Sequence, residues 1–234
     1  VVAAGVGAVA EDNGGPTLEQ IRRAAGAAAR SLAGMESAAF VLPADGPERA
    51  SAVAEGLLLG AYAFNEYKTG DDVKAPLAAA TVVGPGVRAK AVKDAVERAE
   101  VVADAVNTAR NWVNMPPGDQ PPKELADAAA KLAKGVKVDV EVLDEKALAK
   151  GGYGGIIGVG QGSSRPPRLV RIAYQPPKAG KHVAFVGKGI TFDTGGISLK
   201  PNDGMVTMKS DMSGAAAVLA AVIAIAKLAP QVAV

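Results

Sequence analysis

Apolar segments alternate with amphipathic segments along the chain, in the order that α/β folds show. Up to a Gly-Pro-Gly breaker at 84–86, period-2 and helical patterns predict strands at Val1–Val9, Ala38–Leu42 and Ala78–Val83, and helices at Leu18–Leu32 and Pro47–Phe64. Thr17, followed three residues later by Gln20, predicts a capping box at the first helix. This β-α-β-α-β order indicates a small sheet with helices on its faces, and we assign residues 1–85 to one N-terminal α/β domain.

A longer helical pattern from Val87 to about Val113 follows and ends at the breaker cluster Asn114–Gly118. We interpret residues 86–113 as a linking helix. Beyond it the alternation predicts helices at 123–134, 145–150 and 211–228, and strands at 136–143, 168–174, 182–186 and 232–234. Residues 114–234 are therefore expected to form the first part of a second α/β domain, with a mixed central sheet flanked by helices.

Composition narrows the class of protein. Hydrophobic residues make up 49% of the chain and charged residues 21%, as in soluble globular proteins, while 4% aromatics indicate a core of small aliphatic side chains. There is no cysteine, which excludes disulfides and thiolate metal sites. A net charge of +2 without a basic cluster gives no reason to expect nucleic acid as a partner. The longest apolar run, Gly214–Ala226, is too short to span a bilayer, so we expect no membrane and a cytoplasmic location.

Both ends of the chain carry strand-like patterns. The first residue is Val1 rather than Met, and Gln231–Val234 reads as the beginning of a strand. Because strands need neighbours for pairing, we expect these 234 residues to be part of a longer protein.

The chemistry is concentrated in residues 186–216, VGKGITFDTGGISLKPNDGMVTMKSDMSGAA. Glycines let the backbone turn tightly around Lys188 and Asp193, and Asp211 stands at the start of a predicted helix. Two interpretations remain open from spacing alone. The acids and lysine amines suit a hard divalent cation such as Mg²⁺ or Mn²⁺, and Zn²⁺ less obviously. Alternatively, Asp193 is a turn former and Asp211 a helix N-cap, with Lys188 and Lys200 exposed.

This segment resembles the metal-binding core of the leucyl (cytosol) aminopeptidase family, whose pattern is close to VGKG-x-TFDSGG-x-S-x-K-P followed by M-x-x-DM-x-GAA. Two further stretches support the resemblance, ARNWVNMPPGDQPP at 109–122 and GGYGGIIGVGQGSSRPPRLVRIAYQP at 151–176. It covers residues 105–234 closely and residues 1–104 in general architecture. Thr194 replaces the commoner Ser, and Ser213 the commoner Gly.

The resemblance implies a role for five side chains. Lys188, through a neutral amine, and Asp211 are similar to ligands of the same metal, and Asp193 to the carboxylate that bridges two metals. Lys200 matches the catalytic lysine that stabilises charge on the tetrahedral intermediate. Met208 matches a residue lining the pocket for the first side chain of the substrate, with plain core packing as the alternative.

The implied function is hydrolysis of the N-terminal peptide bond of peptides by a metallo-aminopeptidase, a homo-hexamer with two divalent metals, Mn²⁺ or Zn²⁺ with Mg²⁺ as a further candidate, and bicarbonate in the complete enzyme. The family completes its site with an NTDAEGR-type segment that these 234 residues do not contain. The chain alone is therefore expected to be inactive, and the competing hypothesis is a non-catalytic structural or assembly unit.

Two other features of the sequence do not indicate a further binding site. The glycine-rich stretch at 151–164 contains neither GxGxxG nor a Walker motif, which argues against nucleotide binding. His182, the one histidine, is interpreted as a strand-entry or surface residue.

Overall fold

The computed structural model describes residues 1–8 and 15–234, and they fall into two units, residues 1–107 and 108–234. Each unit is described by itself. Helix α3 (Lys90–Asn114) contains the boundary. The prediction of an α/β fold is confirmed, since small sheets and helices occur in both units. The finer division at residues 85 and 113 stays a prediction.

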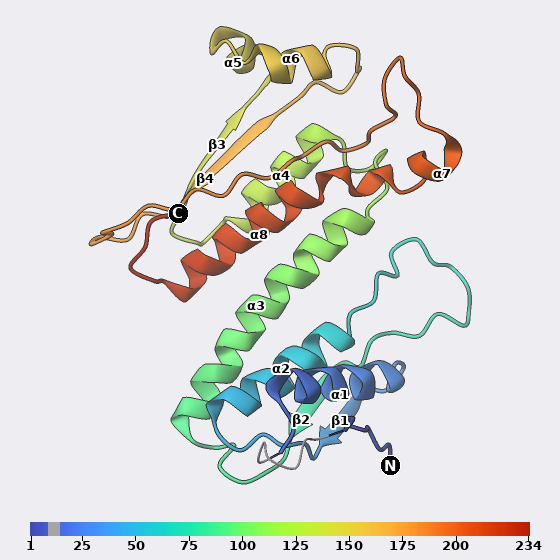
Figure 1. Cartoon of the computed structure of the whole chain (residues 1–234), viewed down its shortest axis with the longest axis vertical. Helices are drawn as coiled ribbons and strands as arrows, with labels where there is room; N and C mark the ends of the chain where they lie inside the picture. The colour runs from blue at the N-terminus through green and yellow to red at the C-terminus, as the bar shows by residue number, and fades with distance from the viewer. Residues whose placement is uncertain (9–14) are drawn as a thin grey trace. The chain divides into compact units, whose positions relative to one another are not determined.

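The first unit is built around two strands and two helices: α1 (Leu18–Ser31), β1 (Ser37–Phe40), α2 (Pro47–Gly60) and β2 (Ala79–Val82). The strands pair in parallel, with Ser37 opposite Ala79 and Phe40 opposite Val82. Parallel strands need a crossover connection, and α2 lies within it, as predicted. Helices α1 and α2 pack along each other, as Figure 1 shows.

Local sequence signals fix where these helices begin. The Thr17 N–H donates to Gln20 Oε1 at 2.9 Å, and the Gln20 N–H donates to Thr17 Oγ1 at 3.3 Å, so the predicted capping box is confirmed. Pro47 occupies the first turn of α2, where its missing N–H leaves no hydrogen bond unmade.

Small residues let α1 and α2 approach closely. A Cβ on Gly56 would lie 2.8 Å from the Ala25 Cβ and closer still to the Arg22 carbonyl oxygen, and a Cβ on Gly60 would collide with Gly26. Around this contact lies a buried cluster that includes Ile21, Val53 and Leu57. The core is thus built from alanine and short aliphatic side chains, as the composition predicts.

The strand predicted at Val1–Val9 is wrong over residues 1–8, which form no strand, and Val9 lies outside the described residues. Val1 and Val2 are exposed. An apolar run forms a strand only when a partner is available to pair with it, and β1 and β2 pair with each other instead.

The second unit contains four shorter helices, two strands, a 3₁₀ helix and a long helix: α4 (Pro122–Leu132), β3 (Asp139–Leu143), α5 (Glu145–Lys150), α6 (Gly154–Gly160), β4 (Leu169–Ala173), α7 (Asn202–Met205), η2 (Met208–Met212) and α8 (Ser213–Leu228). Strands β3 and β4 pair antiparallel, with Asp139 opposite Ala173. In Figure 1, α5 and α6 lie together at one end of this two-stranded ribbon. Helix α8 contacts both α4 and β4.

The sheet of this unit extends beyond the two strands by single pairings. Tyr174 and Val234 exchange two backbone hydrogen bonds, of 2.7 and 3.0 Å, as residues do in antiparallel strands. On its other side, Ala233 forms a parallel bridge with His182. The pairing is mixed, as expected, but the strands predicted at 182–186 and 232–234 reduce to these single pairings, at His182, Ala233 and Val234. Most of 182–186 is exposed, with no neighbouring backbone to extend the ladder within the described residues.

Helix α8 supplies much of the core of the second unit, through buried side chains that include Leu219, Val222 and Ile223. It ends at Ala229, which adopts a left-handed conformation with φ of 51°. Residues 202–228 are long and apolar enough to cross a membrane by length and composition, and 44% of their apolar 18-residue window is buried in the protein. One such helix is a weak indication, because core helices of soluble proteins pass the same test.

Candidate metal centre

The backbone at Lys188 is hydrogen-bonded to the first turn of α8. The Ala215 N–H donates to the Lys188 carbonyl oxygen at 2.8 Å. A Cβ on Gly187 would lie less than 3.0 Å from the Gly214 carbonyl oxygen, and one on Gly214 would lie 2.9 Å from the Lys188 nitrogen. Only residues without a side chain fit here, and their contact brings Lys188 beside the residues that precede α8.

Lys188 and Asp211 form the first ion pair of the site. Lys188 Nζ lies 3.0 Å from Asp211 Oδ2, with exposed side-chain fractions of 60% for the lysine and 19% for the aspartate. Asp211 Oδ2 is itself buried and accepts no hydrogen bond from the part of the chain that the structure describes. The contact is thus one of charge without hydrogen-bond alignment, and it leaves a buried carboxylate oxygen with unused acceptor capacity.

Asp193 and Lys200 form the second pair, with Lys200 Nζ 3.2 Å from Asp193 Oδ2. The Gly195 N–H donates to the other carboxylate oxygen, Asp193 Oδ1, at 2.8 Å. The Gly195 hydrogen bond, then the hydrogen bond and charge of Lys200, and finally the charge of Lys188 hold the pKa of Asp193 below its ordinary value. Asp193 is therefore a carboxylate at neutral pH.

The loop between Asp193 and Lys200 is closed by its own backbone. The Lys200 N–H donates to the Thr194 carbonyl oxygen at 2.9 Å. Gly195 has a φ of 92°, and a Cβ there would run into the Ser198 carbonyl oxygen. The sequence Asp-Thr-Gly-Gly therefore makes a tight loop that returns Lys200 to the carboxylate of Asp193.

The structure brings four of the five predicted site residues into two ion pairs. The charge of Lys188 acts on Asp193 as well as on Asp211, which links the two pairs electrostatically. Met208 is half-buried at the first residue of η2, three residues before Asp211. Asp211 lies in η2, just before α8, so it caps neither helix with its side chain.

The donor atoms of the first pair fit a divalent metal. An amine nitrogen and a carboxylate oxygen are both atoms that can ligate a divalent metal. Lys188 Nζ and Asp211 Oδ2 lie 3.0 Å apart, at an ordinary ion-pair distance. Among residues 1–8 and 15–234, however, no group of three or more His, Cys, Asp or Glu side chains gathers. These residues supply part of a donor set.

Sequence reasoning missed Lys209. Its Nζ donates to the Asn114 carbonyl oxygen at 2.9 Å, 95 positions away along the chain. It also missed Gly214, whose role depends on the approach of Gly187. No pattern of neighbouring residues predicts either contact, because each contact joins segments that are distant in sequence.

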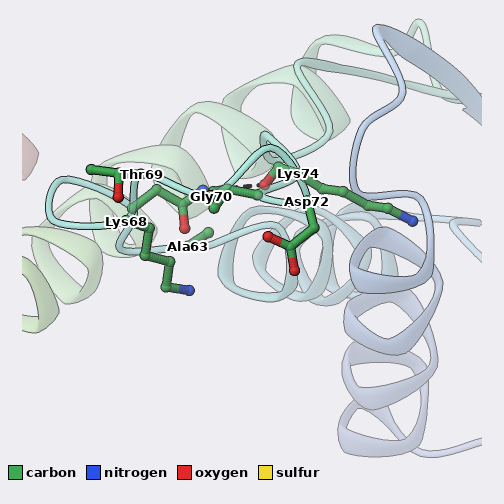
Figure 2. Close-up of a pocket in the computed structure, with 8 residues that line it drawn as sticks. Ala63, Lys68, Thr69, Gly70, Asp72 and Lys74 are labelled. Atoms are coloured by element: carbon green, nitrogen blue, oxygen red, sulfur yellow. Dashed lines mark hydrogen bonds between the residues drawn. The ribbon is translucent and has the colours of Figure 1, made fainter.

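A separate hollow of about 520 Å³ lies in the first unit, away from these residues in sequence. Its lining comes from the loop after α2: Ala63, Asn65, Lys68, Thr69, Gly70, Asp72, Val73 and Lys74. Figure 2 shows the Lys68 and Lys74 side chains extending to opposite sides, with Asp72 between them. The charges therefore do not converge on one point, and the hollow contains none of the predicted site residues.

Two family models match the chain. The model described as the catalytic domain of the cytosol aminopeptidase family matches residues 107–234, and the model for the N-terminal domain of that family matches residues 1–71. Curated relatives named "Probable cytosol aminopeptidase" include those of Streptomyces coelicolor, 53% identical over 99% of this chain and 48% of the relative, and Micrococcus luteus, 52% identical over 97% and 45%. The chain thus spans about half the length of the curated relatives it matches.

Two solved structures are also similar to this chain. The bottromycin maturation enzyme BotP in complex with Mn is 38% identical with a TM-score of 0.81, over 94% of this chain and 47% of that one. The cytosol aminopeptidase from Coxiella burnetii is 28% identical with a TM-score of 0.76, over 93% and 44%.

Proposed function

This chain belongs to the cytosol aminopeptidase family, and on that premise we propose that the protein containing it is a metallo-aminopeptidase that hydrolyses the N-terminal peptide bond of peptides. The observation that carries the proposal is the clustering of Lys188, Asp193, Lys200 and Asp211 in two ion pairs, of 3.0 and 3.2 Å. These two pairs join two lysines and two carboxylates at positions that resemble the family motif, and this supports the proposal.

Lys188 and Asp211 would hold one metal and Asp193 would bridge it to a second. Lys188 would hold a metal only as a neutral amine. When bound, the metals would activate a water and orient the α-amine and carbonyl of the substrate. We propose that the remaining ligands come from a segment outside these 234 residues, of the NTDAEGR type, because no group of three or more His, Cys, Asp or Glu side chains gathers within the described residues.

Lys200 would act on the scissile carbonyl. Its side chain is 29% exposed, and its ammonium lies next to Asp193 at 3.2 Å. A cation held in a partly dry site stabilises negative charge as it develops on the carbonyl oxygen of the tetrahedral intermediate. The closed loop from Thr194 to Lys200 keeps the backbone of Lys200 fixed while its side chain turns from the carboxylate to the substrate. Met208 would line the pocket for the first side chain.

Mn²⁺ is our first choice of metal, supported by the Mn complex of the similar BotP structure, with Zn²⁺ and Mg²⁺ as alternatives. We also propose a hexamer, a cytoplasmic location and bicarbonate as general base. Residues 1–85 would form the N-terminal domain, 86–113 the linking helix and 114–234 the first part of the catalytic domain.

The test uses the complete gene product that carries these residues. After removal of metals with a chelator, Mn²⁺ binding is followed by the electron paramagnetic resonance of free Mn²⁺, and activity is measured on leucine p-nitroanilide. We expect two Mn²⁺ per chain and recovery of activity, with none on an N-acetylated substrate. Asp193→Asn should lose metal and activity, while Asp203→Asn, an exposed acid in α7, should keep both.

Two outcomes would contradict the proposal. Binding of two metals without release of N-terminal residues would rule out the peptidase. If the purified protein has an intact mass of 23.4 kDa and binds no metal, the assembly-unit hypothesis is favoured instead.

A further inference from the structure

We propose that Lys209 is a positioning residue for Asp211, and this rests on the proposed function. Lys209 follows Met208 in η2 and lies two residues before Asp211. Its Nζ donates a partly buried hydrogen bond of 2.9 Å to the carbonyl oxygen of Asn114, the last residue of α3. The bond ties the short helix that carries two proposed site residues to the end of a helix 25 residues long.

The end of α3 is a suitable anchor for a lysine. The last carbonyl groups of a helix have no partner within the helix, and they carry the negative end of its dipole. The last turn of α3 contains no basic residue of its own. Lys209 donates to one of these carbonyl groups and places a positive charge beside the negative end of the helix, and both effects favour the contact.

Helix η2 in turn needs an external anchor. A 3₁₀ helix has poorer hydrogen-bond geometry than an α-helix, and no side chain caps the start of this one. Two further side-chain hydrogen bonds at η2 are local, from Ser210 Oγ to the Thr207 carbonyl at 2.7 Å and from Ser213 Oγ to the Ser210 carbonyl at 2.5 Å. Burial of Met212, 2% exposed, holds its C-terminal end. Lys209 holds its N-terminal end.

The side chains of Lys209 and Asp211 extend from different faces of η2. With about 120° of rotation per residue in a 3₁₀ helix, positions 209 and 211 leave the axis on different faces. Lys209 can therefore bond to Asn114 while Asp211 contacts Lys188 at 3.0 Å. The Lys188 segment is fixed separately by the Ala215–Lys188 hydrogen bond of 2.8 Å. The separation of the two proposed ligands thus depends on how firmly η2 is held.

The test compares Lys209→Met, which keeps the length of the side chain but loses donor and charge, with Lys209→Arg, which can still donate to a carbonyl oxygen. Lys227→Met, at an exposed position near the end of α8, is the matched control. Mn²⁺ affinity is measured by electron paramagnetic resonance in the complete gene product, and melting temperature is recorded for each variant. Loss of a group that orients a ligand weakens metal binding by about 10- to 100-fold.

We expect Lys209→Met to weaken Mn²⁺ binding at least tenfold, on the order of the effect of outer-shell residues, with Lys209→Arg and Lys227→Met close to wild type. Amide exchange at 208–215 should rise in Lys209→Met alone. Wild-type affinity in Lys209→Met would overturn the inference and leave the proposed function standing, as would equal losses in Lys209→Met and Lys209→Arg. Wild-type protein that binds no Mn²⁺ would overturn the proposed function and the inference with it.

Discussion

A Cβ atom on Gly187 would lie less than 3.0 Å from the carbonyl oxygen of Gly214, so the backbones of these two glycines are in direct contact. Their contact places the Lys188 main chain against the first turn of α8, where the Ala215 N–H donates to it. Two residues that contribute no side chain therefore help to set the distance between Lys188 and Asp211, together with the anchoring of η2 by Lys209.

Gly187→Ala should separate these segments. Overpacking of this kind destabilises a protein by about 1–3 kcal/mol, and we expect a fall of that size in the free energy of unfolding, together with weaker Mn²⁺ binding. The measurements are chemical denaturation and metal titration. Gly118→Ala is the control, because a Cβ on Gly118 would meet nothing within 4 Å. Equal behaviour of the two variants would show that the backbone contact is not required.

Lys200→Met should lower kcat while the bound metal is retained. Removing one group that stabilises a developing oxyanion lowers kcat by about 10²- to 10³-fold. Activity on leucine p-nitroanilide and the number of Mn²⁺ ions bound are measured in parallel. Lys181→Met, at an exposed position, should change neither. If Lys200→Met keeps full activity, Lys200 has no catalytic role.

Gly56→Ala should destabilise the first unit, although the same change usually stabilises the interior of a helix by about 0.5–1 kcal/mol. The sign reverses because the new Cβ would lie 2.8 Å from the Ala25 Cβ and closer to the backbone of Arg22. We expect a loss of about 1–3 kcal/mol, measured by urea denaturation. A gain in stability would mean that α1 and α2 can move apart freely.

Thr17→Ala should remove the capping box of α1 and lower the free energy of unfolding by about 1 kcal/mol. Thr17→Ser keeps the hydroxyl that accepts from the Gln20 N–H, so it should behave like wild type. Urea denaturation of both variants checks this. Similar losses for Ala and Ser would point to the methyl group of Thr17 rather than to the cap.

The sequence predicted best those helix boundaries that depend on interactions between neighbouring residues. The start of α1 follows from Thr17 and Gln20, and the helix predicted at 145–150 coincides with α5, which the Asp144 side chain caps by accepting from the Ala147 N–H at 2.8 Å. It failed for α6, whose glycines favour a helix poorly and whose residues are not buried. It also failed for the strand at 182–186, since pairing depends on neighbours far along the chain.

For the candidate site, the motif located the four charged residues but not how they are held. Asp193 and Lys200 lie in one loop, and Gly195 announces the turn between them. The bond between Lys209 and Asn114 joins positions 95 apart, so only the folded chain shows it.

The pairing of Tyr174 with Val234 bears on the order of events during synthesis. Tyr174 leaves the ribosome 60 residues before its partner (from position 174 to position 234), and the two bonds between them add one pairing just beyond the end of β4. At about 5–20 residues per second, that interval is about 3 to 12 s. During it the growing polypeptide carries an open strand edge, the kind of surface on which nascent chains aggregate or recruit a chaperone.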